Sequence, residues 1–232
     1  MSRIIGEDHH CHEHHDESKD LPLILKTEIM GHLPFTILGL IFGLVVVAVG
    51  SYWFHVILTE ESFHFTHFMH IFFSGAAAAA LMTYYEASYG RSVIIGMISS
   101  IILCSLSDTV IPYWGAQLMG KDPVFHLCAI EHPLWVILVA LVGTNVGLIW
   151  LKGFEHCSKW NHLFHIFVSS AASGIYLFSF SRSFAAHEVV GVFIILFIAI
   201  FVPCLVSDVV VPLMAVHPSF FLKRIFKKEG NS

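Results

Sequence analysis

The sequence predicts an all-α integral membrane protein: six transmembrane helices in two inverted three-helix repeats, behind a disordered, histidine-rich N-terminal tail. Three observations lead to this prediction: few charged residues, long apolar runs, and a polar pattern that occurs twice. Charged residues make up 12% of the 232 residues and hydrophobic residues 56%. A soluble domain usually carries about 25% charged residues, so this composition is typical of a chain that lies largely in lipid.

Six apolar segments are long enough to cross about 30 Å of hydrocarbon as helices that rise about 1.5 Å per residue. The predicted spans are residues 33–57, 64–86, 92–115, 133–152, 160–181 and 188–216. The chain starts with polar residues, so we expect no cleavable signal peptide. The sequence divides into a metal-binding tail with its lead-in (1–31), a first repeat (32–115), an outer loop (116–131), a second repeat (132–216) and a basic amphipathic tail (217–232).

The second half of the chain repeats the polar residues of the first half at almost the same spacing. A pattern of His, Gly, His-x-x-His and Ser, followed by Cys-x-x-Ser-Asp-x-x-x-Pro, starts at His32 and again at His132. Because each repeat contains three spans, an odd number, the second copy enters the membrane upside down. Inverted repeats occur in secondary transporters, whose substrate sites lie at the repeat interface.

The basic residues are divided unevenly between the two ends of the predicted spans. Of the 12 Lys and Arg residues, only Lys121 and Arg182 fall in segments on one side. The excess of basic residues on the other side places both termini in the cytoplasm, in a plasma or inner membrane. The net charge of −5 gives no support for nucleic-acid binding. The expected partners are therefore a metal ion and the lipid bilayer, and the sequence leaves a homo-oligomer open.

The N-terminal tail has the composition of a chelating strand. Residues 7–17 contain five histidines, one cysteine and five carboxylates, which cannot form a core. Such a strand suits a borderline divalent ion such as zinc, nickel, cobalt or copper. A solvated polar tail or an expression tag is the alternative, although Cys11 and the acidic residues interrupt the histidines. The expected tail ligands are His9, His10, Cys11, His12, His14 and His15.

Two matching histidine pairs lie inside apolar spans. In the second and the fifth span, two histidines three residues apart are followed by a serine four residues later, as His67, His70 and Ser74 and as His162, His165 and Ser169. Residues at this spacing share one helix face. Two imidazoles on one face can bind one metal ion. Anchoring at the membrane interface is the alternative, but the duplication favours ligands.

The third and sixth spans each place an aspartate four residues before a proline. Asp108 precedes Pro112, and Asp208 precedes Pro212. Proline has no N–H, so we expect a loosened aspartate carbonyl beside the carboxylate, and disrupted backbone is tolerated in a membrane where it lines a cavity. The pattern predicts a cation or proton site, with an ordinary proline kink as the alternative. One turn earlier, Cys104 and Cys204 are either soft ligands or small packing residues.

Depth along the spans divides these residues into two sets. The outer set is His67, His70, Asp108, His132 and Cys104. The inner set is His162, His165, Asp208, His32 and Cys204. The two sets are either stacked along the membrane normal or brought to one midplane site by re-entrant bends. In the outer loop, His126, Cys128 and Glu131 either collect and release metal or are ordinary loop residues without a role in metal binding.

Ionisable groups inside a membrane indicate a functional site. The predicted function is a divalent transition-metal carrier without a catalytic residue, for Zn²⁺ first and Ni²⁺ or Co²⁺ next, coupled to protons and favouring export. One alternative is an intramembrane metal-dependent enzyme, either a zinc hydrolase or a di-iron lipid oxidase. The other alternative is a metal-storage or sensing membrane protein, or a bis-histidine haem protein. The duplication favours transport over an enzyme.

Overall fold

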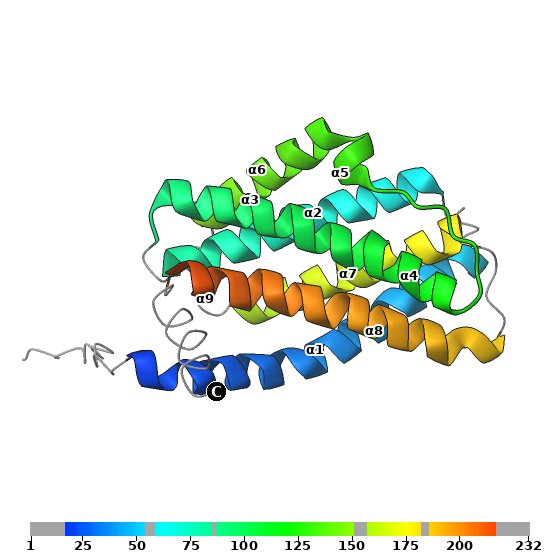
Figure 1. Ribbon diagram of the computed structural model, residues 1–232, viewed down its shortest axis with the longest axis horizontal. Helices are drawn as coiled ribbons and strands as arrows, with labels where there is room; N and C mark the ends of the chain where they lie inside the picture. Colours follow the sequence, from blue (N-terminus) through cyan, green and yellow to red (C-terminus); the bar gives the residue numbers. More distant parts are fainter. Residues whose placement is uncertain (1–16, 54–58, 85–86, 151–156, 182–185, 217–232) are drawn as a thin grey trace, which may run out of the picture.

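Every regular element in the described part of the chain is a helix. A computed structural model describes residues 17–53, 59–84, 87–150, 157–181 and 186–216. The α-helices are α1 (Glu17–Trp53), α2 (Glu60–Tyr84), α3 (Tyr89–Ser105), α4 (Ile111–Leu118), α5 (Cys128–Glu131), α6 (Pro133–Trp150), α7 (Cys157–Phe180), α8 (Val189–Leu205) and α9 (Val211–Val216). The π-helices η1 (Leu106–Val110) and η4 (Val206–Val210) and the 3₁₀-helix η3 (Ala186–Glu188) complete the elements. The long helices run side by side, with α1 and α6 at opposite edges (Figure 1).

The all-helical prediction is confirmed for the described residues, and all six predicted spans fall on helices there. The candidate membrane span Leu33–Gly50 starts where the first span was predicted. The helix α1 itself begins earlier, at Glu17, so it also contains the end of the predicted lead-in.

Three helical segments in the described residues are long and apolar enough to cross a membrane. These segments are Leu33–Gly50, Glu60–Thr83 and Tyr89–Leu118. The helices of the second half are shorter where they are described, at Pro133–Ile149, Phe164–Phe180 and Val189–Leu205. The large apolar side chains of Phe42, Ile94 and Leu134 are exposed, whereas buried positions hold histidines, serines and Asp108. An apolar exterior around a polar interior is the distribution that lipid favours.

Glycines bring two helix pairs into backbone contact. On α6, a methyl group added at Gly143 or Gly147 would run into the α2 backbone at Phe72 and Ala76. In the first half of the chain, Gly43 of α1 has no room for a methyl group against α7. Small residues allow this close approach of helices. The first long helix of each half therefore packs on the second long helix of the other half, α6 on α2 and α1 on α7.

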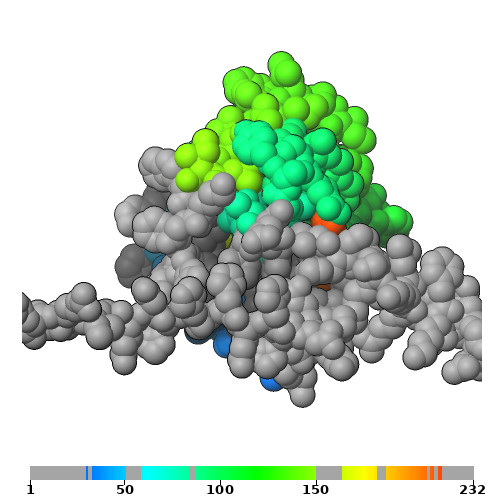
Figure 2. All heavy atoms as spheres, turned by 90° about the vertical axis from the view of Figure 1, so that its left-hand side faces the viewer, coloured from blue at the N-terminus to red at the C-terminus, as the bar shows by residue number. Residues whose placement is uncertain are grey.

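The helix α3 lies against both α2 and α6. Figure 2 looks at one end of the bundle and shows the atoms of α3 and α6 meeting there. The helix α7 crosses the middle of the bundle and contacts α1, α2, η1 and α8. Residues of α7 can therefore meet residues from both halves of the chain.

The helices that carry the two aspartates are each interrupted by a π-helical turn. The Ile111 N–H donates to the carbonyl of Leu106, five residues earlier, and the Val211 N–H donates in the same way to Val206. Each turn lies just before a proline, which cannot form the next helical hydrogen bond. The π turns therefore occur at corresponding positions in the two halves. Such turns are frequent at functional sites because they expose backbone groups.

Candidate metal centres

The helix α2 presents three histidines on one face. Its first turn is closed by Thr59 and Ser62, whose backbone N–H groups each donate to the side-chain oxygen of the other residue, at 2.9 and 3.3 Å. This reciprocal cap fixes the helix start just before the histidines. His64, His67 and His70 follow at intervals of three residues, so successive rings are about 4.5 Å apart along the axis.

Asp108 in η1 receives hydrogen bonds from two of these histidines. The Nδ1 atoms of His67 and His70 lie 2.8 and 2.7 Å from Oδ2 of Asp108. All three side chains are buried, and the exposed fraction of Asp108 is 0%. A carboxylate only accepts, so the Nδ1 atom of each imidazole carries a proton, and in a neutral ring this leaves the lone pair on Nε2. The aspartate thus fixes both histidines in the form that binds metal.

The other carboxylate oxygen of Asp108 is held by serines. Ser107, Ser169 and Ser173 donate to Oδ1 from 3.1, 3.3 and 3.2 Å. The Ser173 hydroxyl also lies 3.3 Å from the carbonyl of Ser107. In the π turn the Ile111 N–H donates to Leu106, so the Ser107 carbonyl is left without its usual helical partner. Asp108 has both oxygens occupied and therefore supports the histidines.

The central cluster consists of His70, His165 and Cys204, from α2, α7 and α8. All three side chains are buried, and their ligand atoms lie within 4.8 Å of one another. The distance between the two Nε2 atoms is 3.3 Å, and Cys204 Sγ lies 3.9 Å from Nε2 of His70. Nitrogen ligands about 2.0–2.1 Å from a tetrahedral Zn²⁺ are about 3.3–3.4 Å apart, and a nitrogen and a sulfur ligand about 3.6 Å. The three atoms are therefore close enough together to hold a metal ion.

Two serine pairs surround the central cluster and join the two halves of the chain. Ser74 of α2 lies 2.8 Å from Ser207 of η4, and Ser107 of η1 lies 3.0 Å from Ser169 of α7, measured between hydroxyl oxygens. Ser74 and Ser169 are matching positions of the repeated pattern, as are Ser107 and Ser207. The same contact is therefore made twice, with the halves exchanged. His70 and His165 are also matching positions, and they meet each other.

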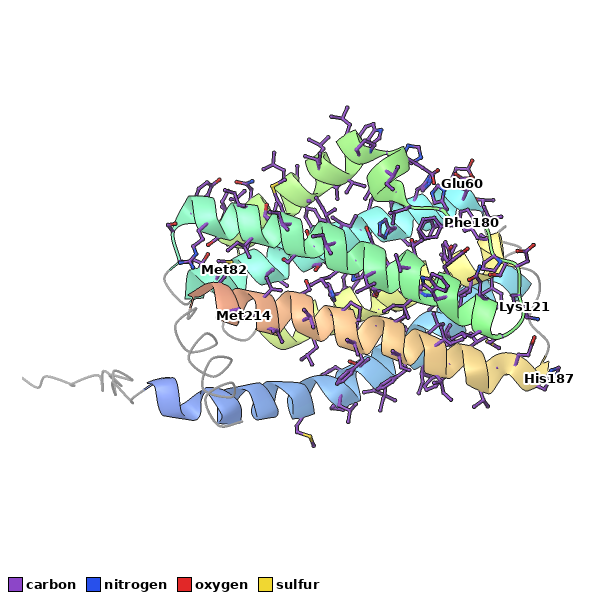
Figure 3. The ribbon with its side chains drawn as sticks, viewed as in Figure 1. Glu60, Met82, Lys121, Phe180, His187 and Met214 are labelled. Atoms are coloured by element: carbon purple, nitrogen blue, oxygen red, sulfur yellow. The ribbon has the colours of Figure 1, made fainter. Side chains whose placement is uncertain are left out.

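The loop-side cluster consists of His64, His126 and Cys128, at the end of the bundle where α2 starts. Glu60 and Phe180 mark this end, and Met82 and Met214 lie at the opposite end (Figure 3). The Nε2 atoms of His64 and His126 are 2.8 Å apart, and Cys128 Sγ lies 3.7 Å from Nε2 of His126. These three ligand atoms also lie within 4.8 Å of one another. Nδ1 of His126 lies 2.9 Å from a carboxylate oxygen of Glu131.

Backbone contacts with α7 hold the loop that carries His126. The Val124 N–H donates to the carbonyl of Phe180, and the Val124 carbonyl accepts from the Tyr176 hydroxyl, both at 2.9 Å. Cys128, the first residue of α5, is buried. Burial, and then the negative charges of Asp108 and Glu131, raise the pKa of the Cys128 thiol to about 12. The thiol is protonated at neutral pH, so a metal ion that binds it displaces a proton.

The structure divides the predicted ligands differently from the outer and inner sets. His67, His70 and Asp108 lie together as expected, but His70 also meets His165 and Cys204, which were assigned to the inner set. The separation into two sets was wrong for these residues because α2 and α7 cross where their histidines face each other. The central cluster therefore contains one ligand from α2, in the first half of the chain, and two from the second half.

Other predicted ligands lie elsewhere. The His132 ring lies beside His64, with ring centroids 4.7 Å apart, and so belongs near the loop-side cluster. Cys104 is buried and is in none of the described ligand groups. The side chains of His32, His162 and Asp208, the tail ligands of residues 1–16 and the basic tail at 217–232 are outside the described residues.

His64 and Glu60 are not among the ligands predicted from the sequence. His64 stands three residues before His67, so the motif is His-x-x-His-x-x-His and its first member was overlooked. Glu60 lies 3.8 Å from both His64 and His126, measured from its Oε1 to the nearest ring nitrogen. Its position at the helix start, one turn before His64, was the available signal.

Comparison with known proteins gives no further assignment. No family model, curated protein or solved structure matches the chain.

Proposed function

We propose that the protein is a divalent transition-metal carrier and that the central cluster is its ion-binding site. The observation that supports this most directly is the meeting of His70 Nε2, His165 Nε2 and Cys204 Sγ at a buried junction of three helices. Ionisable groups at such depth are costly in lipid, so their presence needs a function. A metal ion shared by both halves of the chain provides that function.

The arrangement of the halves supports transport. The exchanged serine pairs and the two π turns fit two inverted three-helix repeats, with six spans and both termini in the cytoplasm of a plasma or inner membrane. In carriers of this type, the substrate binds where the repeats meet. The contact between His70 and His165 lies at such a boundary. Movement of one repeat against the other would expose the ion first to one side and then to the other.

The ligand atoms favour a borderline ion. Two imidazoles and one thiolate are typical of Zn²⁺ sites, and the same atoms bind Co²⁺ and Ni²⁺. We place Zn²⁺ first and treat the ion as the transported substrate. Export and exchange for protons are the direction and coupling that we propose.

An intramembrane zinc enzyme would also use three protein ligands and one open position. Such an enzyme needs a group near the metal that accepts a proton from water. Asp108 is the buried carboxylate closest to the central cluster among the described residues, and both its oxygens already accept hydrogen bonds. This arrangement favours ion binding over water activation.

The test is ion flux into proteoliposomes that contain the purified full-length protein. Zn²⁺, Co²⁺, Ni²⁺ and Mn²⁺ are supplied outside, with and without an imposed pH gradient. We expect saturable Zn²⁺ flux that the His70→Ala variant loses and that the variant of the exposed residue His187 (His187→Ala) keeps. Tight ion binding without flux in either direction would refute the carrier and support a storage or sensing protein.

A further inference from the structure

The loop-side cluster has no part in the site proposed above. It lies at one end of the bundle, and it is assembled from the start of α2, the loop before α5 and α5 itself. The central cluster is built differently, from long helices. The loop-side cluster therefore needs an explanation of its own.

Its polar atoms are arranged like the ligands of a metal ion. Glu131 accepts the Nδ1 proton of His126, at 2.9 Å, which leaves a lone pair on Nε2. That Nε2 faces Nε2 of His64 and Sγ of Cys128, at 2.8 and 3.7 Å. A carboxylate behind a histidine that faces other ligands is the usual arrangement around protein-bound zinc. A hydrogen bond between the two rings explains the shorter distance, but it explains neither the buried thiol nor the carboxylate.

The histidine rings are held in place by aromatic packing. The His126 ring stacks on Phe180, with ring centroids 5.0 Å apart, and Phe63 meets its edge at 5.8 Å. His64 stacks on Phe68 at 6.0 Å. Ligands held in this way do not have to be ordered when the ion binds, which favours affinity.

We propose that the loop-side cluster is a second metal site, for a borderline divalent ion such as Zn²⁺, with His64 Nε2, His126 Nε2 and Cys128 Sγ as its ligands. Glu131 positions His126. The ring of His132 lies beside His64 and is the nearest further imidazole for a fourth ligand. The two nitrogens and one sulfur exclude ions that prefer oxygen ligands, such as Mg²⁺ and Ca²⁺.

The position of the second site on α2 relates it to the central cluster. His64 belongs to the loop-side cluster and His70 to the central cluster, with His67 between them on the same helix face. Nε2 of His67 is buried and has no hydrogen-bond partner among the described residues. An ion held at the loop-side cluster would thus stand at the entrance to the central cluster. This place on a path rests on the proposed transport function, whereas the ion binding itself does not.

The test uses Co²⁺, whose bond to a thiolate gives a charge-transfer band in the near ultraviolet. All proteins are full-length and carry Cys11→Ser, which removes the tail thiol. Cys128→Ser and Cys204→Ser then remove one thiol from each cluster. We expect Cys128→Ser to lose the part of the band that comes from the loop-side cluster and Cys204→Ser to lose the part that comes from the central cluster. Each variant should also bind one Co²⁺ fewer per chain. His126→Ala should lose the same part as Cys128→Ser, with His187→Ala as the control.

The outcomes separate the two proposals. A band that Cys128→Ser and His126→Ala leave unchanged would overturn the second site and leave the central one standing. A band that Cys204→Ser leaves unchanged would count against the central site alone. A Cys128→Ser variant that misfolds would lose helical content by circular dichroism. In that case Glu131→Gln replaces it, and we expect about tenfold weaker Co²⁺ binding at the loop-side cluster.

Discussion

The central cluster and the loop-side cluster place the same chemical groups in two different surroundings. In each, a carboxylate accepts the Nδ1 proton of a histidine whose Nε2 faces another imidazole and a cysteine sulfur. At the centre the carboxylate is Asp108, with an exposed fraction of 0%, and near the loop it is Glu131, with an exposed fraction of 44%. Water screens the second carboxylate and not the first. We therefore expect the central cluster to depend far more on its carboxylate.

The largest expected effect of this difference is at Asp108. Asp108→Asn keeps the shape of the side chain but removes the charge that fixes the protons of His67 and His70. The affinity of the central cluster for Co²⁺ should fall by about 10- to 100-fold, the usual cost of losing such a partner. The titration is made in a Cys128→Ser background, so that only the central cluster contributes its thiolate band. Asp122→Asn, at an exposed loop carboxylate, is the control. An unchanged affinity would contradict the role given to Asp108.

The second effect concerns α2, which carries ligands of both clusters. Gly147→Ala places a methyl group against the α2 backbone at Ala76, where there is no room for it. Overpacking of this kind costs about 1–3 kcal/mol. We expect a lower melting temperature in detergent and weaker Co²⁺ binding at both clusters. Gly90→Ala is the matched control, because a methyl group there meets nothing within 4 Å. Weakening of one cluster alone would show that α2 does not couple the two.

A smaller effect is expected at Glu131. Glu131→Gln removes the carboxylate behind His126, but the exposed position lets water take over part of its role. The Co²⁺ affinity of the loop-side cluster should fall toward the lower end of the range, by about tenfold. Raised salt concentration should weaken binding to the parent protein at this cluster more than at the central one, because exposed charges are screened. If Glu131→Gln and Asp108→Asn lowered the Co²⁺ affinity of their clusters equally, the expected effect of burial on the carboxylate would be refuted.

The smallest effect concerns the reactivity of Cys128. Its raised pKa, about 12, means that little thiolate is present at pH 7. Alkylation by iodoacetamide should therefore be slow and should still increase with pH above about pH 10, whereas an unperturbed thiol, with a pKa of about 8.5, levels off near pH 10. The Cys128 peptide is quantified by mass spectrometry, with the SDS-unfolded protein as the reference. A plateau of the alkylation rate at about pH 10 in the folded protein would refute the raised pKa. Added Zn²⁺ should block the reaction.

Local patterns predicted much of the architecture, and long-range packing accounts for what was missed. Apolar runs were sufficient to place the six helical segments, and spacing was sufficient to place His67 and His70 on one face with Asp108 nearby. The contact between His70 and His165 depends on how α2 crosses α7. Nothing within either helix encodes that crossing, so the two residues were assigned to different sets.

The start of α1 and the loop-side cluster show the same limit. The lead-in was predicted as a segment separate from the first span, but it continues into that span as one helix. The loop residues His126 and Cys128 could be recognised as metal-binding types. Their convergence on His64 depends on the contacts of Val124 with α7, which no local pattern reveals. Periodicity predicts which residues share a face, and tertiary packing decides which faces meet.

The glycine contacts have a mechanical consequence. Where α6 lies on α2 and α1 on α7 with backbone against backbone, little side-chain volume separates the helices, so each pair should move as one rigid body. The seam between these bodies is the boundary of α2 with α7, and His70 and His165 stand on opposite sides of it. A shear along this boundary would change the distance between the two Nε2 atoms that face each other across it. A bound ion would then hold the two rigid bodies together, and its binding or release would change how they lie relative to each other.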